Sequence, residues 1–220
     1  MGFDSLIGVE AVLFDMDGTL IRSEDRTDRS VEAFLEGQGI SFQGVSMSDF
    51  HGMTWAASAA QMQARWPALV DLDVAAALQR AFHNSFVVDP PPPIPGARQA
   101  VCAAADVLPV AIVTSSNRET LELVCEQLYI TQRLAATIGA EDCTESKPSP
   151  QPYQRAAAQL GVDPRACLVF EDSPVGLTSA RRAGAHTIAI GGPPTEGLQI
   201  ADYHQLPQGF FPRIARHSHG

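Results

Sequence analysis

The sequence predicts an α/β protein, a parallel β-sheet covered by helices, with a small helical bundle inserted after the first strand. The first observation is a short apolar run, residues 11–14, which ends in two aspartates and a glycine, as a central buried strand would. The second is that strand and helix patterns alternate from Gly96 onward. The third is a helical pattern between these two regions. The first strand must therefore join the later sheet, which makes residues 21–92 an insertion between its first and second strands.

Directly after the first strand the chain reads Asp15-Met16-Asp17-Gly18-Thr19. Asp15 and Asp17 are two residues apart, so in an extended chain they lean to the same side and repel each other unless a cation lies between them. Asp-Gly is also a common turn signal and Asp often caps a helix, but that alternative accounts for one aspartate rather than two. Hard oxygen ligands at a strand end suit Mg²⁺, so this stretch predicts a magnesium site.

The insertion is predicted to contain three helices, at residues 23–36 or 25–36, 48–66 and 74–86. Ser23 or Asp25 could cap the first of them. The insertion ends at residues 89–96, where four consecutive prolines make the chain extended and stiff. We interpret this segment as a return hinge. The alternative is a docking site for a proline-recognising domain, which the P-x-x-P pattern permits but which the position between two ordered segments disfavours.

Beyond the hinge, the expected helices cover residues 97–105, 118–128, 151–160 and 175–183, and the expected strands cover residues 109–114, 136–139, 166–170 and 187–190. In such a sheet, ligands bind beyond the carboxyl ends of the strands. The tail from residue 191 shows little periodicity. A short edge element is expected near residues 201–203, and residues 213–220 are expected to fray. His217 and His219 form an H-x-H pair, for which no specific role is expected so near a terminus.

Polar residues follow the strand at residues 109–114. The run Thr114-Ser115-Ser116-Asn117 leads directly into a helix, so its hydroxyls and the free N–H groups of the helix start would bind a phosphate. Simple capping of that helix by Ser116 or Asn117 is the alternative.

A second pair of acids follows the strand at residues 166–170, in Glu171-Asp172-Ser173-Pro174. Helix capping accounts for one of these acids but not for both. Four carboxylates at neighbouring strand ends would strongly destabilise the fold without a cation. The expected ligands of Mg²⁺ are therefore Asp15, Asp17, Glu171 and Asp172.

Lys147 lies in a loop stiffened by Pro148 and Pro150. A lone surface lysine is ordinarily only solvated, but here it would offset the carboxylates and bind a substrate phosphate. A carboxylate is a feasible nucleophile toward phosphorus, and a second carboxylate can protonate the leaving oxygen and later activate water. Together these residues predict phosphoryl transfer through an aspartyl-phosphate, with Mg²⁺ and lysine neutralising the transferred group.

The chain has 220 residues and a formal net charge of −10. It lacks the clustered Lys and Arg of a nucleic-acid surface, so the expected partner is a small phosphorylated metabolite, and no obligate protein partner is evident. Its four cysteines form no C-x-x-C pair, which argues against a zinc site and a disulfide scaffold. No apolar run approaches the length of a membrane span and no leader pattern opens the chain, so the expected location is the cytoplasm.

As a set, the motifs resemble the haloacid dehalogenase-like (HAD) superfamily, in particular its phosphatases with a helical cap and the β-phosphoglucomutase-like group. The matching segments are Asp15-Met16-Asp17-Gly18-Thr19, Val113-Thr114-Ser115-Ser116-Asn117, Lys147-Pro148-Ser149-Pro150 with Tyr153, and Glu171-Asp172-Ser173-Pro174 with Gly176. The resemblance implies a Rossmann-like, HAD-like core domain at residues 1–20 and 93–220, and a helical cap domain at residues 21–92 hinged to it.

The resemblance also implies roles for the site residues. Asp15 would be the nucleophile and a metal ligand, and Asp17 the general acid/base that also binds Mg²⁺ through its backbone carbonyl. Thr114 and Lys147 would hold the phosphate, beside Ser115 and Asn117 of the same polar run. Glu171 and Asp172 would complete the metal site.

The chain departs from this pattern at three places. Phosphomutases of the group typically have a histidine where this chain has Thr27, and Gly-x-Ser-Arg where it has Gly-Met-Thr-Trp at residues 52–55. The leading hypothesis is therefore a Mg²⁺-dependent phosphatase acting on a sugar phosphate or phosphoglycolate type of metabolite. The alternatives are a sugar phosphomutase and, less favoured, a non-catalytic binding module. Arg22 replaces an acid found in many relatives and is expected to face solvent. The cap residues that could contact substrate are His51, Trp55, Arg65 and Trp66.

Overall fold

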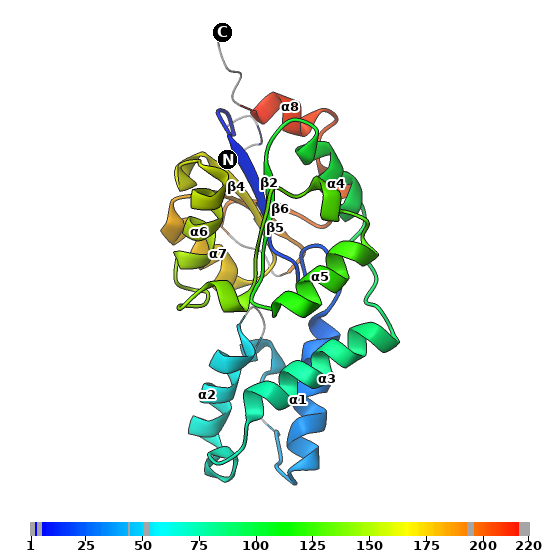
Figure 1. The fold of residues 1–220 in the computed structure, drawn as a ribbon, viewed down its shortest axis with the longest axis vertical. Helices are drawn as coiled ribbons and strands as arrows, with labels where there is room; N and C mark the ends of the chain where they lie inside the picture. Colours follow the sequence, from blue (N-terminus) through cyan, green and yellow to red (C-terminus); the bar gives the residue numbers. More distant parts are fainter. Residues whose placement is uncertain (1–2, 4–5, 44, 51–52, 193–195, 216–220) are drawn as a thin grey trace.

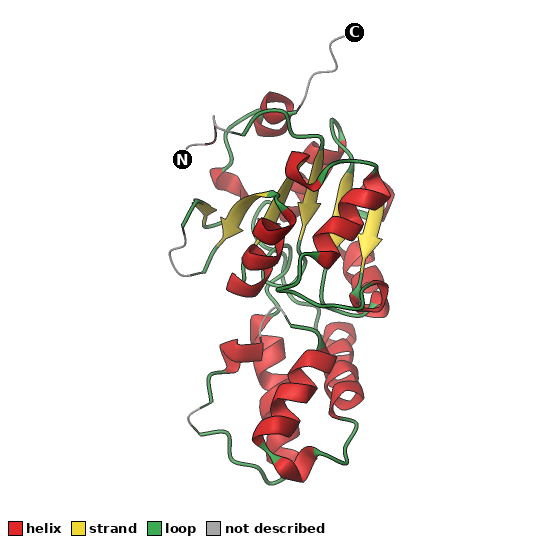
Figure 2. Ribbon diagram, turned by 90° about the vertical axis from the view of Figure 1, so that its left-hand side faces the viewer, coloured by secondary structure: helices red, strands yellow, loops and turns green. Residues whose placement is uncertain are grey.

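The computed structural model of the chain describes residues 3, 6–43, 45–50, 53–192 and 196–215. At its centre is a six-stranded sheet in the order β3-β2-β1-β4-β5-β6, in which every neighbouring pair is parallel. The strands are β1 (Ala11–Phe14), β2 (Val110–Val113), β3 (Ala136–Ile138), β4 (Cys167–Glu171), β5 (His186–Ile190) and β6 (Leu198–Ile200). Helices lie on both faces of the sheet (Figures 1 and 2), which confirms the predicted α/β class.

Strand β1 lies in the middle of the sheet because its four residues are apolar and can be buried on both faces. Its last residue, Phe14, is in register with Ile112 of β2 and Phe170 of β4. The rings of Phe14 and Phe170 stack with their centroids 5.0 Å apart. These strands therefore end close to one another, and the residues that follow them meet at one edge of the sheet.

Four helices cover the sheet, and they are α4 (Ala97–Ala105), α5 (Arg118–Gln127), α6 (Gln151–Leu160) and α7 (Pro174–Ala183). The side chains of β1 alternate between two hydrophobic clusters, as strand geometry requires. Val12 and Phe14 pack with residues of α4 and α5, whereas Leu13 packs with residues of α6 and α7. The four helices, and strands β2 to β5, begin and end within one residue of the predicted positions.

The inserted residues form α1 (Glu24–Gly37), α2 (Trp55–Arg65) and α3 (Val74–Val88), which pack on one another below the sheet in Figure 1. The two segments that connect the helical segment to the sheet lie side by side. The Ile94 N–H donates to the Leu20 carbonyl at 2.9 Å, and the Arg22 N–H donates to the Pro92 carbonyl at 2.9 Å. The proline-rich run is thus extended and paired with the outgoing chain, which is the arrangement expected of a hinge.

A side-chain contact also joins the helical segment to the sheet domain. His83 of α3 lies with Nδ1 3.1 Å from the Thr120 hydroxyl and Nε2 3.3 Å from the Glu119 carboxylate, both on α5. One face of α3 is therefore turned toward the start of α5, where the polar run after β2 ends.

The second helix of the insertion is shorter than predicted. Instead of one helix over residues 48–66, a 3₁₀ turn (Met47–Phe50) is followed by α2, which begins only at Trp55. Thr54 caps α2, because its hydroxyl accepts a hydrogen bond from the Ala57 N–H at 3.2 Å. Trp66 is extended rather than helical, as the residue before a proline tends to be. Of the predicted substrate contacts in this region, His51 lies outside the described residues.

The tail is more ordered than predicted. The edge element is β6, which pairs with β5 just before the expected position at residues 201–203. A further helix, α8 (Phe210–Ile214), includes Arg213, which the prediction assigned to a frayed end. Phe210, Phe211 and Ile214 are buried against the core. A helix of five residues is too short to show a period in the sequence, which explains why it was missed. The H-x-H pair lies outside the described residues.

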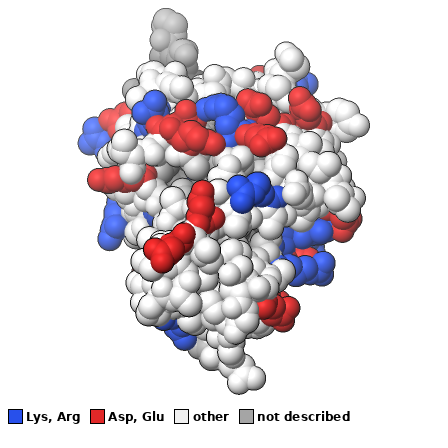
Figure 3. Space-filling model, turned by 60° about the horizontal axis from the view of Figure 1, so that its bottom comes forward, with Lys and Arg blue, Asp and Glu red and all other residues white. Residues whose placement is uncertain are grey.

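The charged side chains are mixed over the face shown in Figure 3. Basic side chains there are interspersed with acidic ones instead of gathering into the single patch that a nucleic-acid surface needs. Within the described part of the chain, no helix combines the length and the apolar character needed to cross a membrane.

Candidate active site

Lys147 joins the ends of the three central strands. Its ammonium donates hydrogen bonds to Asp15 Oδ1 at 2.6 Å, to Glu171 Oε1 at 2.7 Å and to the Val113 carbonyl at 3.2 Å. The side chain is almost completely buried, so the alternative of a solvated surface lysine is wrong. Asp15 directly follows β1, Val113 ends β2 and Glu171 ends β4, so a single cation links all three strand ends.

Burial shifts the pKa values of both Asp15 and Lys147. It raises the pKa of Asp15 to about 8, although Lys147 lowers it, and the nearby charges of Glu171 and Asp17 raise it further. Burial alone would lower the pKa of Lys147, but Asp15 and Glu171 together raise it well above its usual value. Lys147 therefore stays charged, and the effect of burial on the pKa of Asp15 is larger than the opposing effect of Lys147.

Three of the four predicted metal ligands come together. Asp15, Glu171 and Asp172 each offer a carboxylate oxygen, and these oxygens lie within 4.8 Å of one another. Three hard anionic oxygens form a donor set that fits Mg²⁺, and the shortage of positive charge beside Lys147 favours a cation here. Glu171 accepts hydrogen bonds on both of its oxygens, from Lys147, Tyr153 and Ser173, so its first role is to hold this cluster in place.

The side chain of Asp17 is held away from the metal cluster by hydroxyl groups. Asp17 Oδ1 accepts a hydrogen bond from Ser23 at 2.7 Å, and Oδ2 accepts hydrogen bonds from Ser116 at 2.7 Å and from Thr114 at 3.2 Å. Burial raises the pKa of Asp17, and these three hydroxyls lower it only in part. The two aspartates thus occupy different environments, one beside an ammonium and one beside hydroxyls, which suits them to different chemical roles.

The binding of these hydroxyls to Asp17 was not predicted. Thr114 was predicted to hold the phosphate, Ser116 to bind phosphate or cap α5, and Ser23 only to cap a helix, whereas all three donate to Asp17. Ser23 does stand at the cap position of α1, but its side chain makes no cap hydrogen bond, and the side chain of Asn117 makes none at α5. In the sequence, Ser23 and Ser116 are polar residues just before predicted helices. That position is equally compatible with capping the helix and with binding a carboxylate.

Helix α7 is capped by a residue that also anchors Glu171. The Ser173 hydroxyl accepts from the Gly176 N–H at 3.0 Å and donates to Glu171 Oε2 at 3.0 Å. Capping therefore explains neither Glu171 nor Asp172. Gly176 leaves room for this arrangement, because a Cβ at that position would lie 1.5 Å from Glu171 Oε1.

We expect Gly176→Ala to displace the Glu171 carboxylate from Lys147 and Ser173. Losing those buried hydrogen bonds should lower the free energy of unfolding by about 1–3 kcal/mol, measured by urea denaturation. Gly37→Ala is the matched control, because a Cβ at Gly37, the last residue of α1, would meet no atom within 4 Å. Equal stability of the two variants would contradict the role assigned to Gly176.

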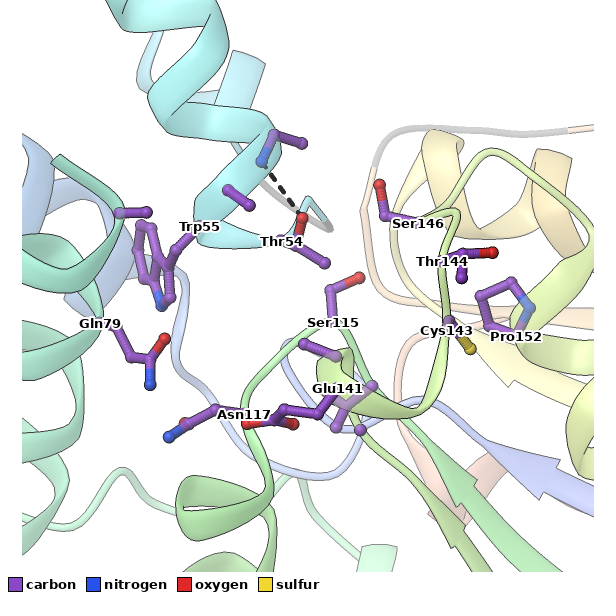
Figure 4. Close-up of a pocket in the computed structure, with 16 residues that line it drawn as sticks. Thr54, Trp55, Gln79, Ser115, Asn117, Glu141, Cys143, Thr144, Ser146 and Pro152 are labelled. Atoms are coloured by element: carbon purple, nitrogen blue, oxygen red, sulfur yellow. Dashed lines mark hydrogen bonds between the residues drawn. The ribbon is translucent and has the colours of Figure 1, made fainter. Parts of the chain in front are cut away.

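Two adjoining cavities lie between the helical segment and the strand ends. The smaller, about 30 Å³, is lined by Asp15 and Asp17, and the larger, about 420 Å³, is lined by Thr114 and Asn117 (Figure 4). Ser115 and Trp55 line both. Of the predicted phosphate-binding residues, Ser115 therefore lies between the aspartates and the larger cavity. Asn117 lines the larger cavity but not the smaller one.

The other residues singled out in the insertion are placed differently. Thr27 lines the smaller cavity beside the aspartates. Arg22 is exposed, as expected. Arg65 lies over the ring of Trp66, with its guanidinium carbon 5.4 Å from the ring centroid, and neither residue lines the two cavities.

Comparison with known proteins places the chain among phosphate-processing enzymes. A family model described as haloacid dehalogenase-like hydrolase matches residues 9–184. Hexitol phosphatase B of Escherichia coli (strain K12) is 31% identical over 192 residues, covering 83% of this chain and 84% of that protein. Validoxylamine A 7'-phosphate phosphatase of Streptomyces hygroscopicus subsp. limoneus is 28% identical over 182 residues, covering 82% of this chain and 85% of that protein.

Solved structures show the same fold at lower identity. β-Phosphoglucomutase (pgmB) of Clostridium difficile superposes with a TM-score of 0.78 at 16% identity, covering 94% of this chain and 96% of that one. CbbY of Rhodobacter sphaeroides in complex with phosphate superposes with a TM-score of 0.76 at 21% identity, covering 90% of this chain and 96% of that one. At these identities the likeness extends to the fold alone.

Proposed function

This chain belongs to the haloacid dehalogenase-like hydrolases, and we propose that within this family it is a Mg²⁺-dependent phosphatase that hydrolyses a small phosphorylated metabolite of the sugar phosphate type. It is an enzyme of the phosphoric monoester hydrolase class. The observation that carries the proposal is the separation of the two aspartates. Asp15 is bound to Lys147, and Asp17 is bound to three hydroxyls.

In the first step, a carboxylate oxygen of Asp15 attacks phosphorus and the bond from phosphorus to the ester oxygen breaks. Asp17 donates its proton to that ester oxygen, so the product leaves as a neutral alcohol. In the second step, Asp17 removes a proton from water as the water attacks phosphorus. The bond between phosphorus and Asp15 then breaks, and inorganic phosphate is released with both aspartates restored.

Charge on the transferred group must be neutralised during both steps. Lys147 supplies one fixed positive charge beside Asp15. Asp15 and Asp172, with Glu171 behind them, would hold Mg²⁺, and the backbone carbonyl of Asp17 is a further expected ligand. When bound, this ion would lower the pKa of Asp15 and stabilise negative charge on the phosphoryl oxygens.

The helical segment acts as a cap in this proposal. Its residues Thr27, Phe50, Met53, Trp55 and Phe82 line the smaller cavity above the aspartates, and most of them are apolar. An apolar lid over the reacting atoms limits the access of bulk water and strengthens the electrostatic interactions beneath it.

A sugar phosphomutase remains the alternative, since it would use the same core residues. Thr27 favours hydrolysis. It lines the smaller cavity, at the position where phosphomutases of the group that the sequence resembles typically have a histidine. Isomerised sugar phosphate that forms without free phosphate would support the mutase instead. The cytoplasmic location stays a prediction.

Removing divalent metal tests the proposal directly. After treatment with EDTA, phosphate release from an aryl phosphate should fall at least about 100-fold, and added Mg²⁺ should restore it. Mg²⁺ should also raise the thermal midpoint of the purified protein, because it binds the folded state. Asp172→Asn is the control, in which the thermal shift should be lost. Release of phosphate that is indifferent to the chelator would overturn the assignment of the metal.

The pKa of Asp17 yields a prediction about pH. The acid must be protonated in the free enzyme, so kcat/KM for an alkyl phosphate falls as pH rises through the pKa of Asp17. Ser116→Ala removes a hydrogen bond that stabilises the ionised form, so this pKa should rise and the alkaline limb of the profile should move to higher pH. Ser85→Ala, whose hydroxyl bonds to the Phe82 carbonyl in α3, should leave the limb unchanged. A shift to lower pH would contradict the acid role.

A further inference from the structure

The larger cavity is where the part of the substrate beyond the phosphate would lie. It adjoins the smaller cavity at Ser115 and Trp55, and its volume of about 420 Å³ is in the range of small-molecule sites. Both parts of the protein line it. Thr54, Trp55 and Gln79 come from the helical segment, and Asn117 and Glu141 come from loops after β2 and β3.

Two amide side chains line this cavity, one from each part of the protein. Figure 4 shows Gln79 of α3 and Asn117, just before α5, turned toward each other beside the Trp55 ring. Asn117 is buried, and its side chain does not cap the helix that follows it. An amide both donates and accepts hydrogen bonds, as does an alcohol, so a pair of amides matches a ligand rich in hydroxyl groups. The ring of Trp55 offers an apolar surface for the C–H side of such a ligand.

The charge of the lining argues against a second anionic group. Among the described residues that line the larger cavity there is no Lys, Arg or His, and the acid Glu141 is present. Glu141 accepts hydrogen bonds from the Arg118 N–H, at 3.0 Å to its nearer oxygen. The guanidinium of Arg118 is turned away to form an ion pair with Asp142, and Lys147 is buried against Asp15 and Glu171. A phosphate or carboxylate in this cavity would meet the like charge of Glu141 and no cationic side chain among the described lining residues.

We propose that Gln79 and Asn117 form a subsite for the leaving group, which selects phosphate monoesters of uncharged polyhydroxylated carbon chains and rejects substrates with a second anionic group. This inference rests on the proposed phosphatase function and narrows it, because it disfavours bisphosphates and phosphoglycolate. Gln79 and Asn117 determine specificity by hydrogen bonds to the leaving group and do not contact the reacting phosphorus.

The experiment compares kcat/KM for four substrates, using the full chain with Mg²⁺. The substrates are a hexitol monophosphate, a hexose bisphosphate, phosphoglycolate and an aryl phosphate. The wild-type protein should prefer the hexitol monophosphate to the hexose bisphosphate and to phosphoglycolate, each of which carries a second anionic group, by at least about tenfold. Because each result is a ratio measured on one preparation, differences in the amount of active protein cancel.

Gln79→Lys places a cation in the subsite. The ratio of bisphosphate to monophosphate turnover should rise by about tenfold or more, because opposite charges then meet at short range. Asn84→Lys is the matched control. It makes the same change of charge on an exposed position of α3 that does not line the cavity, and the ratio should not change. A second variant, Gln79→Leu, removes the hydrogen bonds at similar volume and should lower the ratio of hexitol to aryl phosphate turnover by about tenfold, whereas Asn84→Leu should not.

The outcomes separate this inference from the function on which it rests. If the wild-type protein hydrolyses the bisphosphate or phosphoglycolate as well as the hexitol monophosphate, or if Gln79→Lys behaves like Asn84→Lys, the subsite is wrong while the phosphatase stands. If no ester is hydrolysed, the aryl phosphate included, the phosphatase function itself fails. Preference for the monophosphate, together with the two ratio changes confined to position 79, supports the subsite.

Discussion

Asp15→Asn should reduce the hydrolysis of an aryl phosphate at least about 10⁴-fold, because an amide does not attack phosphorus. The fold should persist. The substitution removes one buried negative charge, and Lys147 keeps its ion pair with Glu171 at 2.7 Å. The thermal midpoint should therefore change little while activity is lost. Turnover above about one per cent of wild type in the purified variant would mean that another group is the nucleophile.

Asp17→Asn provides the comparison that separates the two steps. An aryl leaving group needs no proton, so transfer to Asp15 should still occur, whereas water is no longer activated in the second step. With an aryl phosphate labelled in its phosphoryl group, acid-quenched Asp17→Asn protein should retain the label, and Asp15→Asn protein should carry none. Label retained by both variants, or by neither, would contradict the separate roles of the two aspartates.

The sheet and the charged part of the site could be predicted because they depend on local patterns. Buried strands such as Ala11–Phe14 appear as short apolar runs, and Gly or Pro marks their ends. Once the sheet is parallel, the residues after each strand must meet at one edge. Asp15, Glu171 and Asp172 were brought together by this reasoning, although they are far apart in the chain.

The partners of the site's hydroxyls, and the place of Gln79 in it, could not be predicted in the same way. Whether Ser116 caps α5 or binds Asp17 depends on how two chain segments 99 residues apart are placed. The same is true of Gln79, which is an ordinary polar residue of α3 in the sequence. Its function depends on which face of α3 is turned to α5, and that is set by the pairing of the two hinge segments and by contacts such as that between His83 and Thr120.

Lys147→Met should cause the largest loss of stability of any single substitution at this site. Lys147 is the only lysine in the sequence, and it is buried against two carboxylates. Its removal leaves Asp15 and Glu171 facing each other without compensation, at an expected cost of about 3–5 kcal/mol in the free energy of unfolding, measured by urea denaturation. Lys147→Arg should not rescue the protein, since a guanidinium is larger and cannot replace a point charge at an almost completely buried position.

The double variant Lys147→Met, Glu171→Gln separates the loss of a favourable contact from the burial of unpaired charge. If unpaired carboxylates dominate the cost, neutralising Glu171 should recover part of the stability lost in Lys147→Met, although the enzyme stays inactive. If the double variant is less stable than Lys147→Met, the hydrogen bonds that Glu171 accepts from Tyr153 and Ser173 outweigh the relief of charge, and the electrostatic account is wrong. Because no other lysine is present, amine-reactive labelling reports on this side chain and the chain's α-amino group alone. Lys147 should resist labelling in the native wild-type protein and react once urea unfolds it, which shows directly whether the ammonium is enclosed as the ion pairs at 2.6 and 2.7 Å require.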